Sequence, residues 1–138
     1  MDKRLIAEKL DSLFRCIERI ESKKPASKEI LNDDLDLQDI LAINLERAVQ
    51  LAVDIGAHII SNSVNTSPAT MGEVFTILEK MDVIQLSTAE KMYSAVGFRN
   101  IAVHAYEKIN WSIVYSIIND NLNDFRLFAR DISDFLQL

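Results

Sequence analysis

Glycine, proline and cysteine are all scarce in this chain of 138 residues, which has three glycines, two prolines and one cysteine. β-Sandwiches and barrels need many tight turns, so this scarcity argues against them and favours long helices. The single cysteine, Cys16, cannot form an internal disulfide. Its apolar neighbours predict a reduced core thiol, which is typical of a cytosolic protein.

Long hydrophobic runs are also lacking. No stretch approaches the roughly 18 consecutive apolar residues of a membrane span. Charges at Asp2, Lys3 and Arg4 and the lack of a following apolar run argue against an N-terminal signal. We therefore expect a cytoplasmic protein with no membrane segment. The length suits one domain over residues 1–138.

Positive charge is in short supply, because the net charge is -6. This balance does not indicate a nucleic-acid-binding protein. The distribution is uneven, since residues 1–28 hold eight Lys and Arg against five acids and the remainder holds seven against sixteen. Any polyanion would have to find a local basic patch. Solvated helix faces are the simpler explanation of this asymmetry.

Apolar residues recur at helical spacing and predict an all-α protein. We expect an antiparallel bundle of four long helices plus one short helix. The long helices are expected over residues 3–22, 36–61 and 88–108 and after Asn110, and the short one over 70–80. Loops are expected over 22–35, which contains Pro25, and over the polar segment 61–68.

Apolar stripes and capping residues define these helices further. Thr70 with Glu73, and Ser87 with Glu90, have the spacing of capping boxes, and Asn110 is an expected N-cap. The first stripe consists of Ile6, Leu10, Leu13, Ile17 and Ile20. The second consists of Leu41, Leu45, Ala48, Ala52, Ile55 and Ile59. The last helix is expected to bury Ile113, Val114, Ile117, Ile118, Leu122, Phe125, Phe128, Ile132 and Phe135.

One stretch, GFRNIAVHAYEKIN at residues 97–110, carries an arginine, a histidine and a tyrosine within eight positions. At about 100° per residue, Arg99 and Tyr106 fall on one strip of the expected helix, and Asn100 and His104 on another. The buried stripe that they flank is expected to consist of Phe98, Ile101 and Ala105, with Ala102 and Val103 beside it.

The chemistry open to this stretch is specific. An imidazole moves protons near neutral pH, and a guanidinium matches phosphate oxygens with a fixed fork of donors. Together they suffice for metal-independent cleavage of RNA, whose 2′-OH is an internal nucleophile. Arg99 and His104 are about 140° apart in projection, so either Arg99 reaches a phosphate near the imidazole or a two-fold partner brings the groups together. On spacing alone, a surface ion pair, a boundary histidine and a packing aromatic are the simpler roles.

The same residues resemble a known family. Arg99-x4-His104-x-Tyr106 is similar to the R-x4-H-x-Y motif of the HepT toxins, a branch of the HEPN superfamily of helical domains, and Asn100 also fits the pattern. The resemblance extends in order along nearly the whole chain, except 22–35. It includes the segments VDIGAHIIS, MGEVFTILEKMDVI, VGFRNIAVHAY and IVYSIINDNLNDF.

This resemblance implies a HEPN-like fold, a homodimer and a metal-independent endoribonuclease that acts as the toxin of a type II-like toxin–antitoxin module. The implied antitoxin is a nucleotidyltransferase of the MntA type, which transfers AMP from ATP to the motif tyrosine. By position, Arg99 and His104 would be catalytic, Asn100 would be a supporting polar group, and Tyr106 would accept AMP. No metal or cofactor is implied. The alternative is a non-catalytic helical subunit that binds a nucleotidyltransferase or presents substrate to it.

Other residues admit structural explanations. Asp54 and His58 are four apart, but two ligands are too few for a metal site, so we expect structural contacts. Asp54 reaching the motif helix to orient Arg99 or Asn100 is the alternative. Gly97, inside a helix, predicts a close helix crossing or a local bend. Trp111 and Tyr115 are expected to pack on the bundle, with base stacking as the alternative. Five other charged residues, Glu18, Arg19, Glu46, Arg47 and Asp131, are expected to be solvated.

Overall fold

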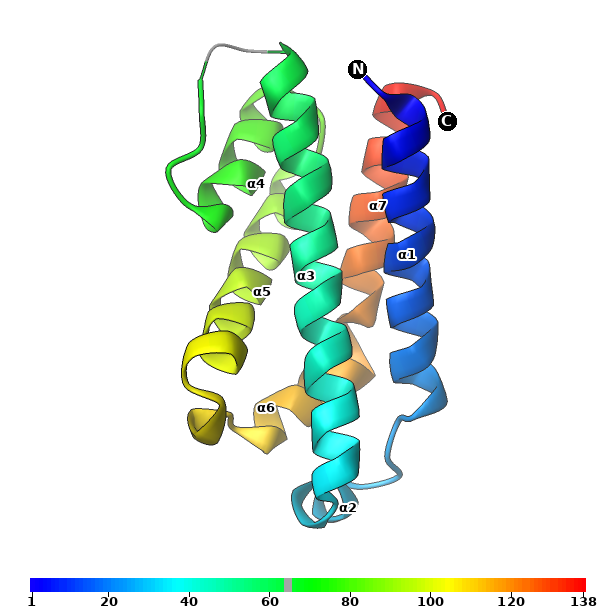
Figure 1. Ribbon diagram of the computed structural model, residues 1–138, viewed down its shortest axis with the longest axis vertical. Helices are drawn as coiled ribbons and strands as arrows, with labels where there is room; N and C mark the ends of the chain where they lie inside the picture. Colours follow the sequence, from blue (N-terminus) through cyan, green and yellow to red (C-terminus); the bar gives the residue numbers. More distant parts are fainter. Residues whose placement is uncertain (64–65) are drawn as a thin grey trace.

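The computed structural model describes residues 1–63 and 66–138, and helices and their connections make up these two ranges. The helices are α1 (Lys3–Ser22), α2 (Lys28–Asp33), α3 (Leu35–Ser63), α4 (Met71–Lys80), α5 (Leu86–His104), α6 (Trp111–Ser116) and α7 (Leu122–Leu136). A 3-10 turn, Tyr106–Lys108, follows α5, and a π-helical turn, Ile117–Asn121, joins α6 to α7. The long helices α1, α3, α5 and α7 alternate in direction, so both termini lie at one end (Figure 1). The expected all-α antiparallel bundle is confirmed.

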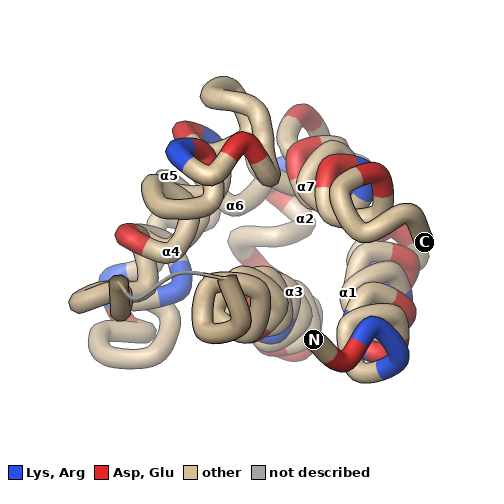
Figure 2. Tube along the Cα trace, turned by 90° about the horizontal axis from the view of Figure 1, so that it is seen from above, with Lys and Arg blue, Asp and Glu red and all other residues tan. Residues whose placement is uncertain are grey.

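The two N-terminal stripes behave as expected. Every residue of both is buried, and α1 packs along α3. Asp2 caps α1, since its Oδ1 accepts a hydrogen bond from the Leu5 amide at 3.0 Å. Seen from the end with both termini, Lys and Arg are spread over several helices rather than gathered on one (Figure 2). None of the described helices has the length and hydropathy that a membrane crossing requires.

The expected loop at 22–35 contains a helix. Ser27 Oγ accepts a hydrogen bond from the Ile30 amide at 3.3 Å and so caps α2, which buries Leu31. Asp34 Oδ1 then accepts from the Leu37 amide at 3.0 Å, and α3 begins one residue earlier than predicted. Helix α3 also extends to Ser63, and the predicted loop over 61–68 lies partly outside the described residues.

The last predicted helix is divided. Asn110 is the N-cap of α6, as expected, because its Oδ1 accepts from the Ser112 amide at 3.0 Å. The π-helical turn then shifts the register of the apolar pattern before α7 begins. Two residues of the predicted apolar pattern are exposed: Ile113, which precedes this turn, at 56%, and Phe135, near the end of α7, at 43%.

The N-terminus of helix α5 is not capped in the predicted way. The Ser87–Glu90 box is wrong, because Gln85 occupies the N-cap without a side-chain cap. The Gln85 amide instead donates to Asp131 Oδ2 on α7 at 3.2 Å, so Asp131 is buried rather than solvated. The Thr70 cap of α4 is confirmed, since Thr70 Oγ1 accepts from the Glu73 amide at 3.2 Å. The Glu73 carboxylate accepts a hydrogen bond from the Ala69 amide, whereas a capping box would use the amide of Thr70.

Candidate functional site

Helix α5 ends inside the motif. Ala105 leaves helical geometry at φ -149° and ψ 54°, although its amide still donates to the Ile101 carbonyl at 2.9 Å. His104 is therefore the last helical residue, and Tyr106 belongs to the following 3-10 turn. The prediction that Arg99 and Tyr106 share one helical strip is wrong, because the helix does not continue between them.

The buried face of α5 also differs from the predicted stripe. Ala102 and Val96 are buried, whereas Phe98 is half-buried and Ile101 is 45% exposed. Contacts with α3, α4 and α7 set this face. Tertiary packing thus leaves an apolar residue exposed beside the motif.

Arg99 is half-buried and lies against α3. Its Nη2 donates to Gln50 Oε1 at 3.2 Å, and its Nη1 donates to Asn100 Oδ1 at 3.4 Å. Gln50 Nε2 in turn donates to Asp54 Oδ1 at 3.0 Å, and Asp54 Oδ2 lies 3.9 Å from Lys9 Nζ. Asp54 therefore supports Arg99 through Gln50 rather than directly. Gln50 was not among the predicted site residues, although its spacing of four from Asp54 was a signal.

The guanidinium of Arg99 has no acidic partner among the described residues. Both contacts use neutral amide oxygens, and no carboxylate of residues 1–63 or 66–138 lies within ion-pair distance. Its buried Nε has no hydrogen-bond partner in these ranges. A surface ion pair for Arg99 is therefore wrong. An arginine held by neutral groups retains a full positive charge for an anionic ligand.

His104 is exposed at the C-terminal end of α5, and among the described residues its side chain makes no hydrogen bond or ion pair. It is not the hydrogen-bonded boundary residue of the simpler explanation. Its imidazole is therefore accessible from solvent. The structure shows no contact between Arg99 and His104 within one chain. It brings Arg99 together with Asn100 and Gln50, but not with His104.

Tyr106 is held from two sides. Its hydroxyl donates to Asp39 Oδ1 on α3 at 2.5 Å. Its ring meets Trp111 edge-on, with centroids 5.9 Å apart and planes at 66°. Burial, the hydrogen bond to Asp39 and the charge of that carboxylate raise the pKa of Tyr106 above its ordinary value. Trp111 packs on the bundle, as predicted, and Tyr115 does so too, its hydroxyl donating to the Ala26 carbonyl at 3.5 Å.

A hollow of about 670 Å³ lies beside Arg99 and Asn100. The N-terminus of α4 and exposed Tyr93 also line it, and a Cβ built on Gly97 would meet no described atom within 4 Å. The close crossing predicted at Gly97 is therefore wrong. Among the residues that line this hollow, the close contact is at Gly72, where a Cβ would lie 2.7 Å from the Tyr93 ring.

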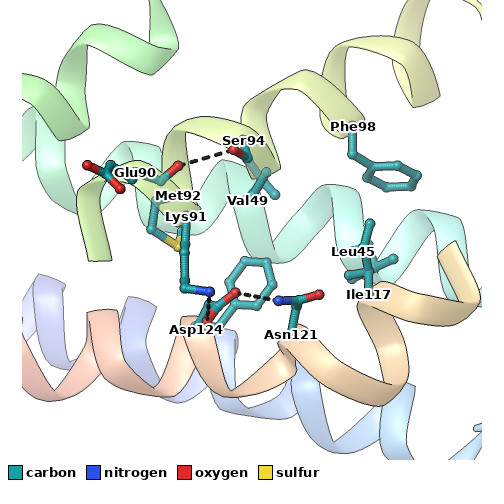
Figure 3. A pocket seen from close by; sticks show the side chains of 12 residues that line it. Leu45, Val49, Glu90, Lys91, Met92, Ser94, Phe98, Ile117, Asn121 and Asp124 are labelled. Atoms are coloured by element: carbon teal, nitrogen blue, oxygen red, sulfur yellow. Dashed lines mark hydrogen bonds and ion pairs between the residues drawn. The ribbon is translucent and has the colours of Figure 1, made fainter. Parts of the chain in front are cut away.

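A second pocket, of about 420 Å³, lies on another face of α5 (Figure 3). Leu45, Phe98 and Ile117 contribute apolar surface, and Lys91 Nζ lies 3.9 Å from Asp124 Oδ1. Arg99 and His104 do not line this pocket. Lys91 therefore lies at this second pocket and not at the hollow beside Arg99.

Asp54 and His58, which are four residues apart on α3, make structural contacts. His58 Nε2 accepts a hydrogen bond from the Asp2 amide at 3.4 Å, while Asp54 contacts Gln50 and Lys9. Within residues 1–63 and 66–138, no group of three His, Cys, Asp or Glu side chains is placed to hold a metal ion.

Comparisons with known proteins agree with this picture. The family model described as Ribonuclease HepT-like matches residues 13–132. The mRNA nuclease HepT of Shewanella oneidensis is 32% identical over 124 residues, covering 90% of this chain and 92% of that protein. The tRNA nuclease HepT of Aphanizomenon flos-aquae is 26% identical over 132 residues, covering 96% and 90%.

The fold is also similar to that of a solved structure. The tri-AMPylated Shewanella oneidensis HEPN toxin, in complex with its MNT antitoxin, superposes with a TM-score of 0.87 at 31% identity. The match covers 94% of this chain and 96% of that one. The expected class of enzyme, a toxin–antitoxin ribonuclease, is confirmed at the level of the family. The matched family model and these relatives show that the chain belongs to the HepT-like ribonuclease family.

Proposed function

We propose that this protein is a metal-independent endoribonuclease toxin in which Arg99 and His104 act on RNA. One observation carries the proposal. Arg99 is fixed by the neutral amides of Gln50 and Asn100, so it is positioned without being neutralised. His104 is exposed five residues later on the same helix. The HepT nucleases named above provide the independent support.

The reaction follows from these groups. His104 takes the proton of the ribose 2′-OH or delivers one to the leaving 5′-oxygen. The 2′-oxygen attacks the adjacent phosphorus, and the bond to the 5′-oxygen breaks. Arg99 stabilises the negative charge that develops on the phosphorane-like transition state, and Asn100 helps to orient Arg99. DNA lacks the 2′-OH and is not a substrate of this mechanism.

A homodimer completes the site. Arg99 and His104 make no contact within one chain, so a two-fold partner can bring the arginine of one copy to the histidine of the other. Exposed Ile101 and Val103 lie beside the motif, at 45% and 41% exposure, and provide apolar surface for such an interface. Pairing two sites also doubles the local positive charge, which an acidic chain needs for RNA binding.

An MntA-type nucleotidyltransferase is the proposed antitoxin, and Tyr106 is the proposed AMP acceptor. The Shewanella toxin is AMPylated in complex with its MNT antitoxin. Tyr106 is 38% exposed and lies two residues after His104. An attached AMP would place a phosphodiester anion near the imidazole, where it would repel the RNA backbone. We expect this regulation to take place in the cytoplasm.

The test is cleavage of total RNA by Arg99→Ala and His104→Ala. Both variants should lose at least about 100-fold in rate, because each removes a group that acts only in the transition state. Circular dichroism and sedimentation should show an unchanged fold and assembly. Wild-type cleavage by either folded variant would overturn the catalytic assignment and favour the non-catalytic subunit.

A further inference from the structure

We propose that Asp39 on α3 prepares Tyr106 for modification, orienting its hydroxyl and accepting its proton as AMP is transferred. The inference rests on the proposed function, in which Tyr106 is the acceptor. Asp39 lies outside the motif and 67 residues from Tyr106 in sequence. The fold alone brings the two side chains together.

The contact is short and specific. Tyr106 Oη donates to Asp39 Oδ1 at 2.5 Å, which is within the distance required for direct proton transfer. Among the described residues, Asp39 makes no ion pair and its side chain has no other hydrogen-bond partner. The carboxylate is thus not occupied by a structural contact elsewhere.

The phenol is also held in place. Trp111 contacts the Tyr106 ring edge-on at 5.9 Å between centroids. The 3-10 turn that carries Tyr106 is closed by the Lys108 amide, which donates to the Ala105 carbonyl at 2.8 Å, and by the Ile109 amide, which donates to the Tyr106 carbonyl at 3.1 Å. The hydroxyl is therefore presented at the surface in one orientation, as an acceptor group for another enzyme must be.

The step balances with one proton and one leaving group. Tyr106 Oη attacks the α-phosphorus of ATP held by the nucleotidyltransferase. The new oxygen–phosphorus bond forms as the bond to the β-phosphate bridging oxygen breaks, and pyrophosphate leaves. The phenolic proton passes to Asp39 Oδ1 and then to solvent, because Asp39 is exposed. A neutral phenol is a weak nucleophile, so removing its proton during the attack is what makes it reactive.

The experiment measures transfer of label from α-³²P-ATP by an MntA-type nucleotidyltransferase to the full-length protein. Asp39→Asn preserves the shape and a hydrogen-bond acceptor but is not a proton acceptor. The rate should fall by about 10²- to 10⁴-fold, the usual contribution of a general base, while the KM for this protein changes little. Asp36→Asn, an exposed carboxylate one turn earlier on α3, is the matched control and should label at the wild-type rate.

Two further variants separate the outcomes. Asp39→Ala should recover part of its rate in added formate, which replaces the missing carboxylate, whereas a merely structural defect would not respond. Failure of this rescue would overturn the proton-accepting role. Unlabelled Tyr106→Phe together with wild-type labelling of Asp39→Asn would overturn the inference alone. Undiminished labelling of Tyr106→Phe would overturn the acceptor assignment in the proposed function, and the role of Asp39 with it.

Discussion

Arg99 illustrates how a single residue can be fixed without losing its charge. A carboxylate would hold the guanidinium firmly but would neutralise it, and RNA would then have to displace that partner. Gln50 supplies an oxygen acceptor without a charge, and Asp54 fixes the orientation of the Gln50 amide from behind. Because Gln50 lies between the Asp54 carboxylate and the Arg99 guanidinium, Arg99 stays available to a phosphate.

Gln50→Glu tests this arrangement. The new carboxylate would pair with Arg99, so the rate of RNA cleavage should fall by about 10-fold or more. Single-turnover kinetics with excess enzyme measure the effect. Gln137→Glu, which adds the same charge at the exposed end of α7, should cleave normally. Equal rates for Gln50→Glu and wild type would show that the neutrality of this contact is unimportant.

Tyr106 gives the molecule a distinctive response to alkaline pH. Its pKa is raised above the ordinary 10.0 by burial, by its hydrogen bond to Asp39 and by the charge of that carboxylate. Above about pH 10 the folded protein therefore binds more protons than the unfolded chain. Stability that is fully present below this pH should be lost as pH rises through the folded-state pKa.

Urea unfolding between about pH 9 and 11 measures this loss. Wild type should lose stability more steeply than Tyr106→Phe above about pH 10, since phenylalanine has no proton to release. The difference in absorbance at 295 nm between the two proteins should report a phenol that ionises above its ordinary pKa. Parallel stability curves would contradict the effect of the Asp39 contact.

At the scale of elements, two glycines in helices have opposite surroundings. A Cβ built on Gly56 of α3 would lie 2.5 Å from Val74 Cγ1 and 2.8 Å from Leu78 Cδ1. Helix α4 can therefore pack this close to α3 only because residue 56 has no side chain. A Cβ on Gly97 of α5 would meet no described atom within 4 Å. Glycine therefore serves helix packing at position 56, whereas at position 97 it leaves the hollow beside Arg99 wide.

Alanine substitutions should separate the two. Gly97→Ala should stabilise the fold by about 0.5–1 kcal/mol, because it reduces the freedom of the unfolded chain without a clash. Gly56→Ala should destabilise it by about 1–3 kcal/mol through overpacking against α4. Free energies of unfolding in urea provide the comparison. A stability loss in Gly97→Ala would show that this position contacts another part of the protein or a second copy.

At the scale of the whole molecule, assembly is the property on which the proposed site depends. One chain presents Arg99 towards α3 and His104 at the exposed end of α5. Exposed Ile101 lies between them in sequence, on the face that packing within one chain leaves uncovered. A symmetric interface at this face would bury that apolar surface and join the two halves of the site.

Ile101→Lys should therefore yield a folded monomer that cleaves RNA poorly. The side chain is 45% exposed, so the substitution should leave helix content unchanged while placing two lysines against each other in a dimer. Sedimentation equilibrium and cleavage assays measure the two effects. Ile30→Lys, on α2 and 48% exposed, is the control and should keep the wild-type assembly. A dimeric, active Ile101→Lys would place the interface elsewhere.

Helices with a strong apolar period, and the residues of the motif, could be predicted from local sequence patterns. The stripes of α1 and α3 predicted the buried residues because a helix of 20 or 29 residues presents one face repeatedly. Arg99, Asn100, His104 and Tyr106 could be named because they are close in sequence. Asn110 and Thr70 were found because caps act over three residues.

The contacts of those residues with the rest of the chain depend on the tertiary fold. Gln50 meets Arg99 across 49 positions, Asp39 meets Tyr106 across 67, and Asp131 caps α5 from α7 across 46. Periodicity describes one helix and is silent about such partners. The end of α5 at His104 and the π-helical turn before α7 escaped prediction for the same reason. Periodicity alone extends a helix through both places, because the apolar pattern continues across them.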